Sequence, residues 1–126
     1  MGMVFYEDLL PLPFKLNGRF TEGVECDGLD CYGLCIELCR RDGKVLRDLN
    51  CIKVSEAEFV EDIGRVNLAE IPEEEAGAGD IVQNMWRGEV HIAYLLDTKT
   101  VIQATVAGVR VSPVMTLRHR KYFRVV

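Results

Sequence analysis

The 126-residue sequence lacks the features of a membrane protein and of a secreted one. No apolar run approaches the roughly 18 residues that a membrane-spanning helix needs. The first ten residues include Glu7 and Asp8 and have no basic region before an apolar run, so they do not form a secretory signal. We therefore expect a protein that does not insert into a membrane and that is cytoplasmic as expressed.

The sequence also lacks an excess of basic residues. Its 20 acidic and 15 basic residues give a formal net charge of −5. A protein that binds nucleic acid through its phosphates needs a basic face, so nucleic acid is not an expected partner. The basic residues near the end, Arg118–Lys121 and Arg124, form a short run of the kind that usually lies on a solvated strand.

The five cysteines lack the spacing of a metal site or a disulfide framework. An odd number cannot all pair within the chain, and three of them fall in one short predicted helix, which suits reduced thiols. No two are spaced as C-x₂-C, and a straight helix cannot wrap three thiolates around one ion. We therefore expect no metal and no other cofactor.

The length fits a single domain, and no repeat or low-complexity segment divides it. We therefore treat residues 1–126 as one domain. Residues 1–29, which we call the lead-in, are predicted to be rich in loops. A Pro-Leu-Pro run at 11–13 breaks any helix, and Asn17-Gly18 and Asp27-Gly28 signal turns.

Two helices are predicted in the N-terminal half. Apolar residues recur with helical spacing over residues 30–42, with Asp30 as a suitable N-cap and Gly43 as a suitable terminator. A second helix is predicted to begin at Ser55, because Glu58 follows that serine at the spacing of a capping box.

The periodicity changes near residue 80 to short runs rich in Val, Ile and Thr, separated by turn residues. The predicted strands are Asp80–Trp86, Glu89–Asp97, Thr100–Thr105, Val109–Pro113 and Tyr122–Val126. Helices followed by such strands are typical of the α+β class. We expect N-terminal helices packed on a C-terminal antiparallel β-sheet meander.

Cys31 is a candidate nucleophile because it directly follows the predicted N-cap, Asp30. The positive end of the helix dipole and the unpaired backbone N–H groups of the first turn favour a thiolate, which is the nucleophilic form. The N–H of Cys31 itself is available as an oxyanion donor. The alternative is that Cys31 is a small buried apolar residue, as cysteines often are.

His91 and Gln103 are polar residues within apolar, strand-like segments. His91 is the better candidate base, because the other histidine, His119, lies in a charged run near the end. A base needs a third group to orient its ring, and the carboxamide oxygen of Gln103 can accept the imidazole N–H. The alternative is a structural histidine whose nitrogens are satisfied in the core.

The connection between the two strands decides whether His91 and Gln103 meet. A two-residue turn at Thr98-Lys99 would pair Tyr94 with Gln103 and place His91 on the opposite face of the sheet. A three-residue connection or a bulge would pair Ala93 with Gln103, and His91 would then be a diagonal neighbour of Gln103 on one face. We predict the second register.

These segments resemble the NlpC family of papain-like cysteine peptidases, which cleave peptides of the bacterial cell wall. Residues 28–34, Gly-Leu-Asp-Cys-Tyr-Gly-Leu, look like the nucleophile motif of that family. Residues 79–82 are similar to its Gly-Asp strand opening, residues 91–95 to its histidine strand, and residues 101–104 to the strand with its third polar residue. The resemblance covers roughly residues 12–114.

The resemblance implies a papain-like NlpC-type fold with Cys31, His91 and Gln103 as the catalytic residues. It also implies that Asp30, Tyr32 and Phe14 lie beside the oxyanion or the substrate. Phe14 stands where the family usually has a tyrosine, so any hydrogen bond from that hydroxyl is missing here.

The implied activity is hydrolysis of peptidoglycan stem peptides between γ-D-glutamyl and the diamino acid. Tyrosine after the cysteine is the form that we associate with family members in phage tails, which implies phage tail proteins as partners and a virion-associated location. Two alternatives stay open. One is a non-catalytic tail-assembly protein that retains the fold, and the other is a papain-like amidase or acyltransferase acting on another substrate.

Overall fold

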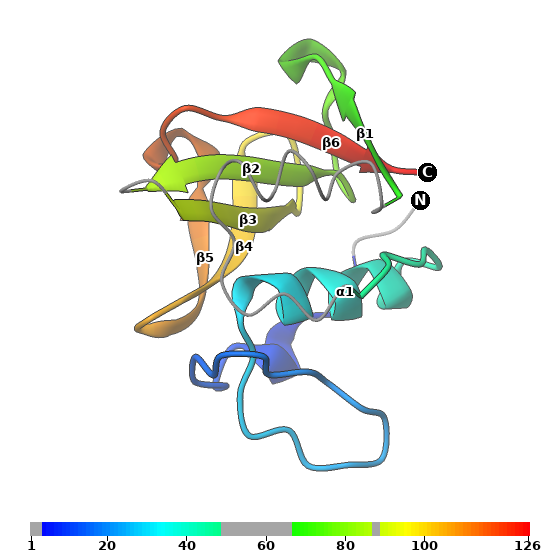
Figure 1. Ribbon diagram of the computed structural model, residues 1–126, viewed down its shortest axis with the longest axis vertical. Coiled ribbons are helices and arrows are strands. Elements are labelled where there is room, and N and C mark those ends of the chain that lie inside the picture. The colour runs from blue at the N-terminus through cyan, green and yellow to red at the C-terminus, as the bar shows by residue number, and fades with distance from the viewer. Residues whose placement is uncertain (1–3, 49–66, 87–88) are drawn as a thin grey trace.

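The computed structural model of the chain describes residues 4–48, 67–86 and 89–126 (Figure 1). Within these ranges the chain forms one α-helix, α1 (Cys31–Arg41), and a single sheet. The strands are β1 (Leu68–Ile71), β2 (Ile81–Trp86), β3 (Glu89–Leu95), β4 (Thr100–Thr105), β5 (Gly108–Pro113) and β6 (Lys121–Val125). Short 3₁₀ turns lie at η1 (Glu7–Leu9), η2 (Glu73–Glu75) and η3 (Val114–Thr116).

The sheet is antiparallel, with strand order β1-β6-β2-β3-β4-β5. Strands β2 to β5 follow one another as a meander, and β6 returns to lie between β1 and β2. Figure 1 shows α1 along one side of this sheet, with the lead-in on the far side of the helix. None of the helices in the described ranges has the length and apolar character that a membrane crossing requires.

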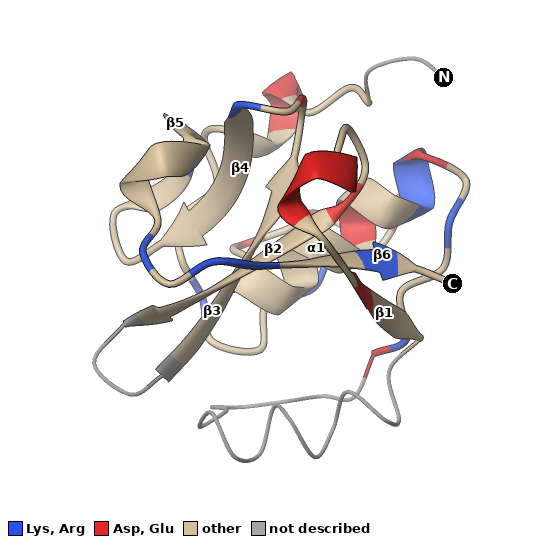
Figure 2. Cartoon of the chain, turned by 90° about the horizontal axis from the view of Figure 1, so that it is seen from above, with Lys and Arg blue, Asp and Glu red and all other residues tan. Residues whose placement is uncertain are grey.

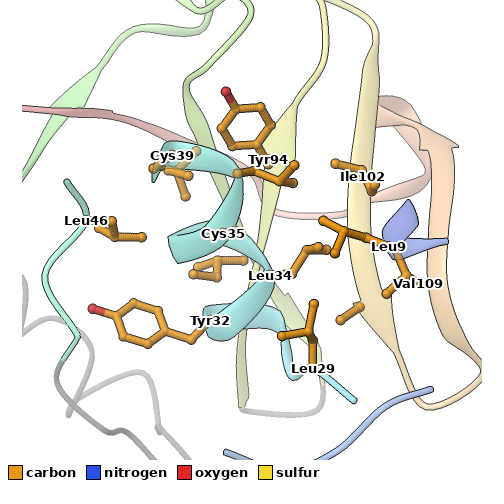
Figure 3. Close-up of a cluster of buried hydrophobic side chains, with 14 of the residues drawn as sticks. Leu9, Leu29, Tyr32, Leu34, Cys35, Cys39, Leu46, Tyr94, Ile102 and Val109 are labelled. Atoms are coloured by element: carbon orange, nitrogen blue, oxygen red, sulfur yellow. The ribbon is translucent and has the colours of Figure 1, made fainter. Parts of the chain in front are cut away.

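Buried side chains fill both faces of the sheet. The larger cluster lies between α1 and the sheet, where Leu34 and Cys35 of the helix pack with Tyr94 of β3 and Ile102 of β4 (Figure 3). Full burial of a large apolar side chain contributes roughly 1.5–3 kcal/mol, so this cluster is what fixes α1 on the sheet. The cluster on the other face includes Val82, Ala93, Leu95, Val101 and Tyr122.

The fold class expected from the sequence is wrong. We expected N-terminal helices packed on a sheet, but the described structure is mostly antiparallel sheet with α1 as its one α-helix. The second helix, predicted to begin at Ser55, lies outside the described residues. Moreover, β1 extends the sheet beyond the predicted meander. It is held by pairing with β6 more than 50 residues away, as in Leu68 opposite Val125, which no local pattern reveals.

The lead-in is tied directly to the start of α1. Phe14 forms an isolated parallel bridge with Leu29, and the Lys15 N–H donates to the Leu29 carbonyl at 3.2 Å. The backbone at Gly18 lies so close to Gly33 in the first turn of α1 that a Cβ on Gly33 would overlap the Gly18 carbonyl oxygen. A glycine at position 33 is therefore required for the lead-in to pack on the helix.

We expect Gly33→Ala to lower the free energy of unfolding by about 1–3 kcal/mol, the usual cost of overpacking a close contact. Gly77→Ala is the matched control, because a Cβ there meets no atom within 4 Å. Urea unfolding monitored by circular dichroism measures both variants. Equal stability of the two variants would contradict the close packing of the lead-in on α1.

Candidate active site

Cys31 lies at the start of α1, as the sequence predicts. Asp30 is the N-cap, with extended backbone geometry, and its Oδ1 accepts the Gly33 N–H at 2.7 Å. This bond satisfies one of the backbone donors that a helix leaves unpaired in its first turn. The cap therefore fixes the point at which the helix begins, and with it the position of the Cys31 side chain.

The Asp30 carboxylate also binds the lead-in. Its Oδ2 accepts the Asn17 N–H at 2.9 Å, and its Oδ1 accepts a hydrogen bond from Arg19 Nη1 at 2.9 Å. Asn17 has a φ of 61°, a left-handed conformation that asparagine tolerates better than most residues. Asp30 is buried, and its described contacts are with these groups and Gly33, so its visible role is to build the site.

His91 and Gln103 are in direct contact. The pairs Tyr94–Ile102 and Leu95–Val101 have the register that the sequence analysis predicts, because continuing it by one residue aligns Gln103 with Ala93. Leu96 N–H donates to the Thr100 carbonyl, closing a three-residue connection between β3 and β4. As a result, His91 Nε2 lies 2.8 Å from Gln103 Oε1.

This contact selects the form of the imidazole. A carboxamide oxygen only accepts hydrogen bonds, so Nε2 of His91 carries the proton, and in the neutral ring Nδ1 is the basic nitrogen. Burial lowers the pKa of His91 from its ordinary value and outweighs the Gln103 hydrogen bond, which acts in the opposite direction. His91 is therefore neutral at pH 7 and able to accept a proton at Nδ1.

The sulfur of Cys31 lies against β3 at the residue that follows His91. In the described strands the ladder between β3 and β4 stops at Tyr94–Ile102, and the backbone of Ile92 beyond it hydrogen-bonds the sulfur. Thus Cys31 approaches β3 next to the place where Gln103 reaches His91. Within the described part of the chain, no hydrogen bond joins Cys31 to His91.

The sequence analysis expected the helix start to favour the Cys31 thiolate, and the structure indicates the opposite. Burial raises the pKa of the Cys31 thiol to about 11, and the charge of Asp30 acts in the same direction. Hydrogen bonds from the backbone of Ile92, Tyr32 and Cys31 itself favour the thiolate but are outweighed. The sequence argument considered the helix end and not the burial of the sulfur, and burial is the larger effect here.

Tyr32 and Phe14 take different positions. Tyr32 is buried, its hydroxyl donates to the Arg47 carbonyl, and the Arg19 guanidinium lies 5.6 Å from its ring centre. Tyr32 extends from the first turn of α1 on the side of Leu46 (Figure 3). Phe14 keeps 37% of its surface exposed in the lead-in, where it lies beside Leu29, the residue two positions before Cys31.

Two polar residues of β2 were missed by the sequence analysis. Asn84 pairs with His91 and Gln83 pairs with Ile92, and both side chains are buried. Asn84 Oδ1 has no hydrogen-bond partner in the described structure, and Gln83 Nε2 donates to the sulfur of Met85 at 3.7 Å. The signal was a polar pair inside an apolar strand, which is the argument that identified Gln103.

Unlike Asp30 and Arg19, the charged groups at the C-terminal end of α1 and along β6 lie away from this site. Figure 2 shows Lys and Arg at the C-terminal end of α1 and along β6. Arg124 binds the buried Asp80 carboxylate through Nε and Nη2, at 3.0 and 2.9 Å. In the described ranges, no group of three or more His, Cys, Asp or Glu side chains is arranged to hold a metal ion.

Comparison with known proteins adds no relative: no family model matches the chain, and no curated protein matches it in sequence.

We expect the rate of Cys31 alkylation by iodoacetamide to rise about tenfold per pH unit from pH 7 to pH 10, because a pKa of about 11 leaves the thiolate a minor species throughout. Peptide mapping by mass spectrometry follows Cys31, and the half-buried Cys26 in the same sample monitors the reagent. A rate that reaches its plateau below pH 8.5 would show that the helix end outweighs burial.

Proposed function

We propose that this protein is a cysteine hydrolase that cleaves amide bonds by acyl transfer. Cys31 is the nucleophile, His91 is the general base and Gln103 orients the histidine. The observation that carries the proposal is the 2.8 Å contact between His91 Nε2 and Gln103 Oε1, which leaves Nδ1 of His91 as the basic nitrogen. The next residue, Ile92, binds the Cys31 sulfur through its backbone. An oriented base beside a thiol at a helix start is the arrangement that nucleophilic catalysis requires.

In the proposed mechanism both groups start neutral, in keeping with the raised pKa of Cys31 and the lowered pKa of His91. As the sulfur attacks the substrate carbonyl, the thiol proton passes to His91 Nδ1. The backbone N–H of Cys31 donates to the developing oxyanion. His91 then gives its proton to the leaving amine, a thioester remains on Cys31, and water activated by His91 hydrolyses it.

The proposed substrate is a peptidoglycan stem peptide, cut between γ-D-glutamyl and the diamino acid, in a protein associated with a phage tail. The support for this part is the resemblance of residues 28–34 and of the two following strand motifs to the NlpC family. The structure adds a reason for the glycine of that motif, since only glycine at position 33 lets the lead-in pack against α1.

Purified muropeptides of defined sequence test both parts of the proposal. We expect the wild-type protein to release two peptide products and Cys31→Ala to release none. We expect His91→Ala to lose about 10²–10⁴-fold in kcat/KM, the usual contribution of general base catalysis. Cys26→Ala is the matched control, because Cys26 lies in the lead-in and, among the described residues, donates to the carbonyls of Arg19 and Gly28.

Mass spectrometry of the products identifies the bond that is cut. Cleavage of another amide bond that still depends on Cys31 would support the proposed hydrolase activity and contradict the proposed bond. Product formation that survives Cys31→Ala would contradict the proposed nucleophile.

One observation favours a second candidate function, a non-catalytic tail-assembly protein. The half-buried Cys31 thiol, whose pKa desolvation raises to about 11, is poorly suited to attack without a base. The two functions differ in what His91 does. In the hydrolase, replacing His91 lowers kcat/KM by about 10²–10⁴-fold. In an assembly protein, neither the wild type nor the variant cleaves a muropeptide.

A further inference from the structure

Arg19 connects three parts of the molecule at the start of α1. Its Nη1 donates to the Gly18 carbonyl at 2.8 Å and to Asp30 Oδ1 at 2.9 Å. Its Nε and Nη2 donate to the two carboxylate oxygens of Asp48 at 3.0 and 3.2 Å. Only 20% of the Arg19 side chain is exposed, and its bonds to Gly18 and Asp30 are partly buried, whereas its bonds to Asp48 lie at the surface.

The ion pair with Asp30 matters because that carboxylate is buried. Asp30 keeps 7% of its side chain exposed, and a buried charge without a partner is costly. The neighbouring Cys31 must become negatively charged during nucleophilic attack, and the Asp30 charge opposes this. Arg19 is the cation that directly contacts Asp30 in the described structure, so it offsets that charge where it acts.

The other titratable or charged groups around Cys31 are few in the described residues. On its own helix they are Asp30 and Cys35, which is buried one turn further on. On β3 it is His91, the residue before Ile92. From the lead-in it is Arg19, through Asp30. Arg19 is therefore the one fixed positive charge among these groups.

We propose that Arg19 is a positioning residue for the Cys31 site: it holds the Asp30 carboxylate in its capping position and offsets its charge, so that a thiolate can form beside it. This inference rests on the proposed function, because it assigns to Arg19 a role in activating the proposed nucleophile. Its test needs no turnover.

Alkylation of Cys31 by iodoacetamide at pH 8 measures how readily the thiolate forms. We expect Arg19→Met to slow this reaction about three- to tenfold, since loss of a neighbouring positive charge raises a thiol pKa by up to about one unit. Asp30→Asn keeps a good N-cap and removes the negative charge, so it should speed the reaction. Lys15→Met is the matched control, because Lys15 pairs at 2.7 Å with the exposed Asp27 and not with Asp30.

The double variant Arg19→Met/Asp30→Asn gives the decisive comparison. If Arg19 acts by offsetting the Asp30 charge, Arg19→Met should change the alkylation rate less than twofold once Asp30 is neutral. If Arg19 only packs the lead-in, its loss should expose the sulfur and speed alkylation equally in both backgrounds, and that result overturns the proposal. Equal slowing in both backgrounds also overturns it.

Arg19→Gln is the second neutral variant, used if Arg19→Met does not fold, because glutamine retains a donor for Asp30. The same predictions apply to it. Muropeptide cleavage by the wild-type protein is measured separately. If the alkylation rates show that Arg19 offsets the Asp30 charge but no muropeptide is cleaved, the proposed hydrolase activity is overturned and the role of Arg19 stands. If muropeptides are cleaved but the alkylation rates show no such effect, the role of Arg19 is overturned and the hydrolase activity stands.

Discussion

The cap formed by Asp30 is the interaction on which the rest of the site depends. One buried carboxylate accepts hydrogen bonds from Gly33 in α1, Asn17 in the lead-in and the Arg19 side chain. These bonds determine where the helix begins and how the lead-in covers it, and so where the Cys31 sulfur lies. The same carboxylate carries a negative charge next to a group that must also become negative. The structure resolves this conflict with Arg19 rather than by removing the acid, because a neutral cap would lose the charge-assisted bonds that hold the lead-in.

The second constraint is the connection between β3 and β4. Its three residues set the register that brings Gln103 to His91, and the ladder then stops at Tyr94–Ile102. The backbone of Ile92 is thereby left to bind the Cys31 sulfur. The start of α1 at Cys31 thus meets the end of the β3–β4 pairing near Ile92, although the two lie about 60 residues apart in the chain. The apolar cluster between α1 and the sheet holds them together (Figure 3).

Local signals in the sequence predicted the elements that depend on local chemistry. Asp30 as N-cap, α1 and strands β2 to β6 all follow from capping residues, periodicity and turns. The register between β3 and β4 was predicted because the His91–Gln103 pair requires it, and not from the residues of the turn. Features set by distant contacts were not predictable in this way. The fold class was wrong, and β1 was missed because its partner is at the other end of the chain. The pKa of Cys31 was predicted in the wrong direction, because burial of the sulfur appears only when α1 is packed on β3. The role of Arg19 in the cap has no local signal at all.

The central claim is that Cys31 attacks an amide carbonyl and carries the acyl group as a thioester. The most direct measurement is intact-protein mass spectrometry after rapid acid quenching of the protein with a muropeptide substrate. The account predicts a mass increase equal to the acyl fragment, located on the Cys31 peptide and absent from Cys31→Ala. Cleavage of the muropeptide with no adduct on Cys31, or an adduct on another residue, would contradict it.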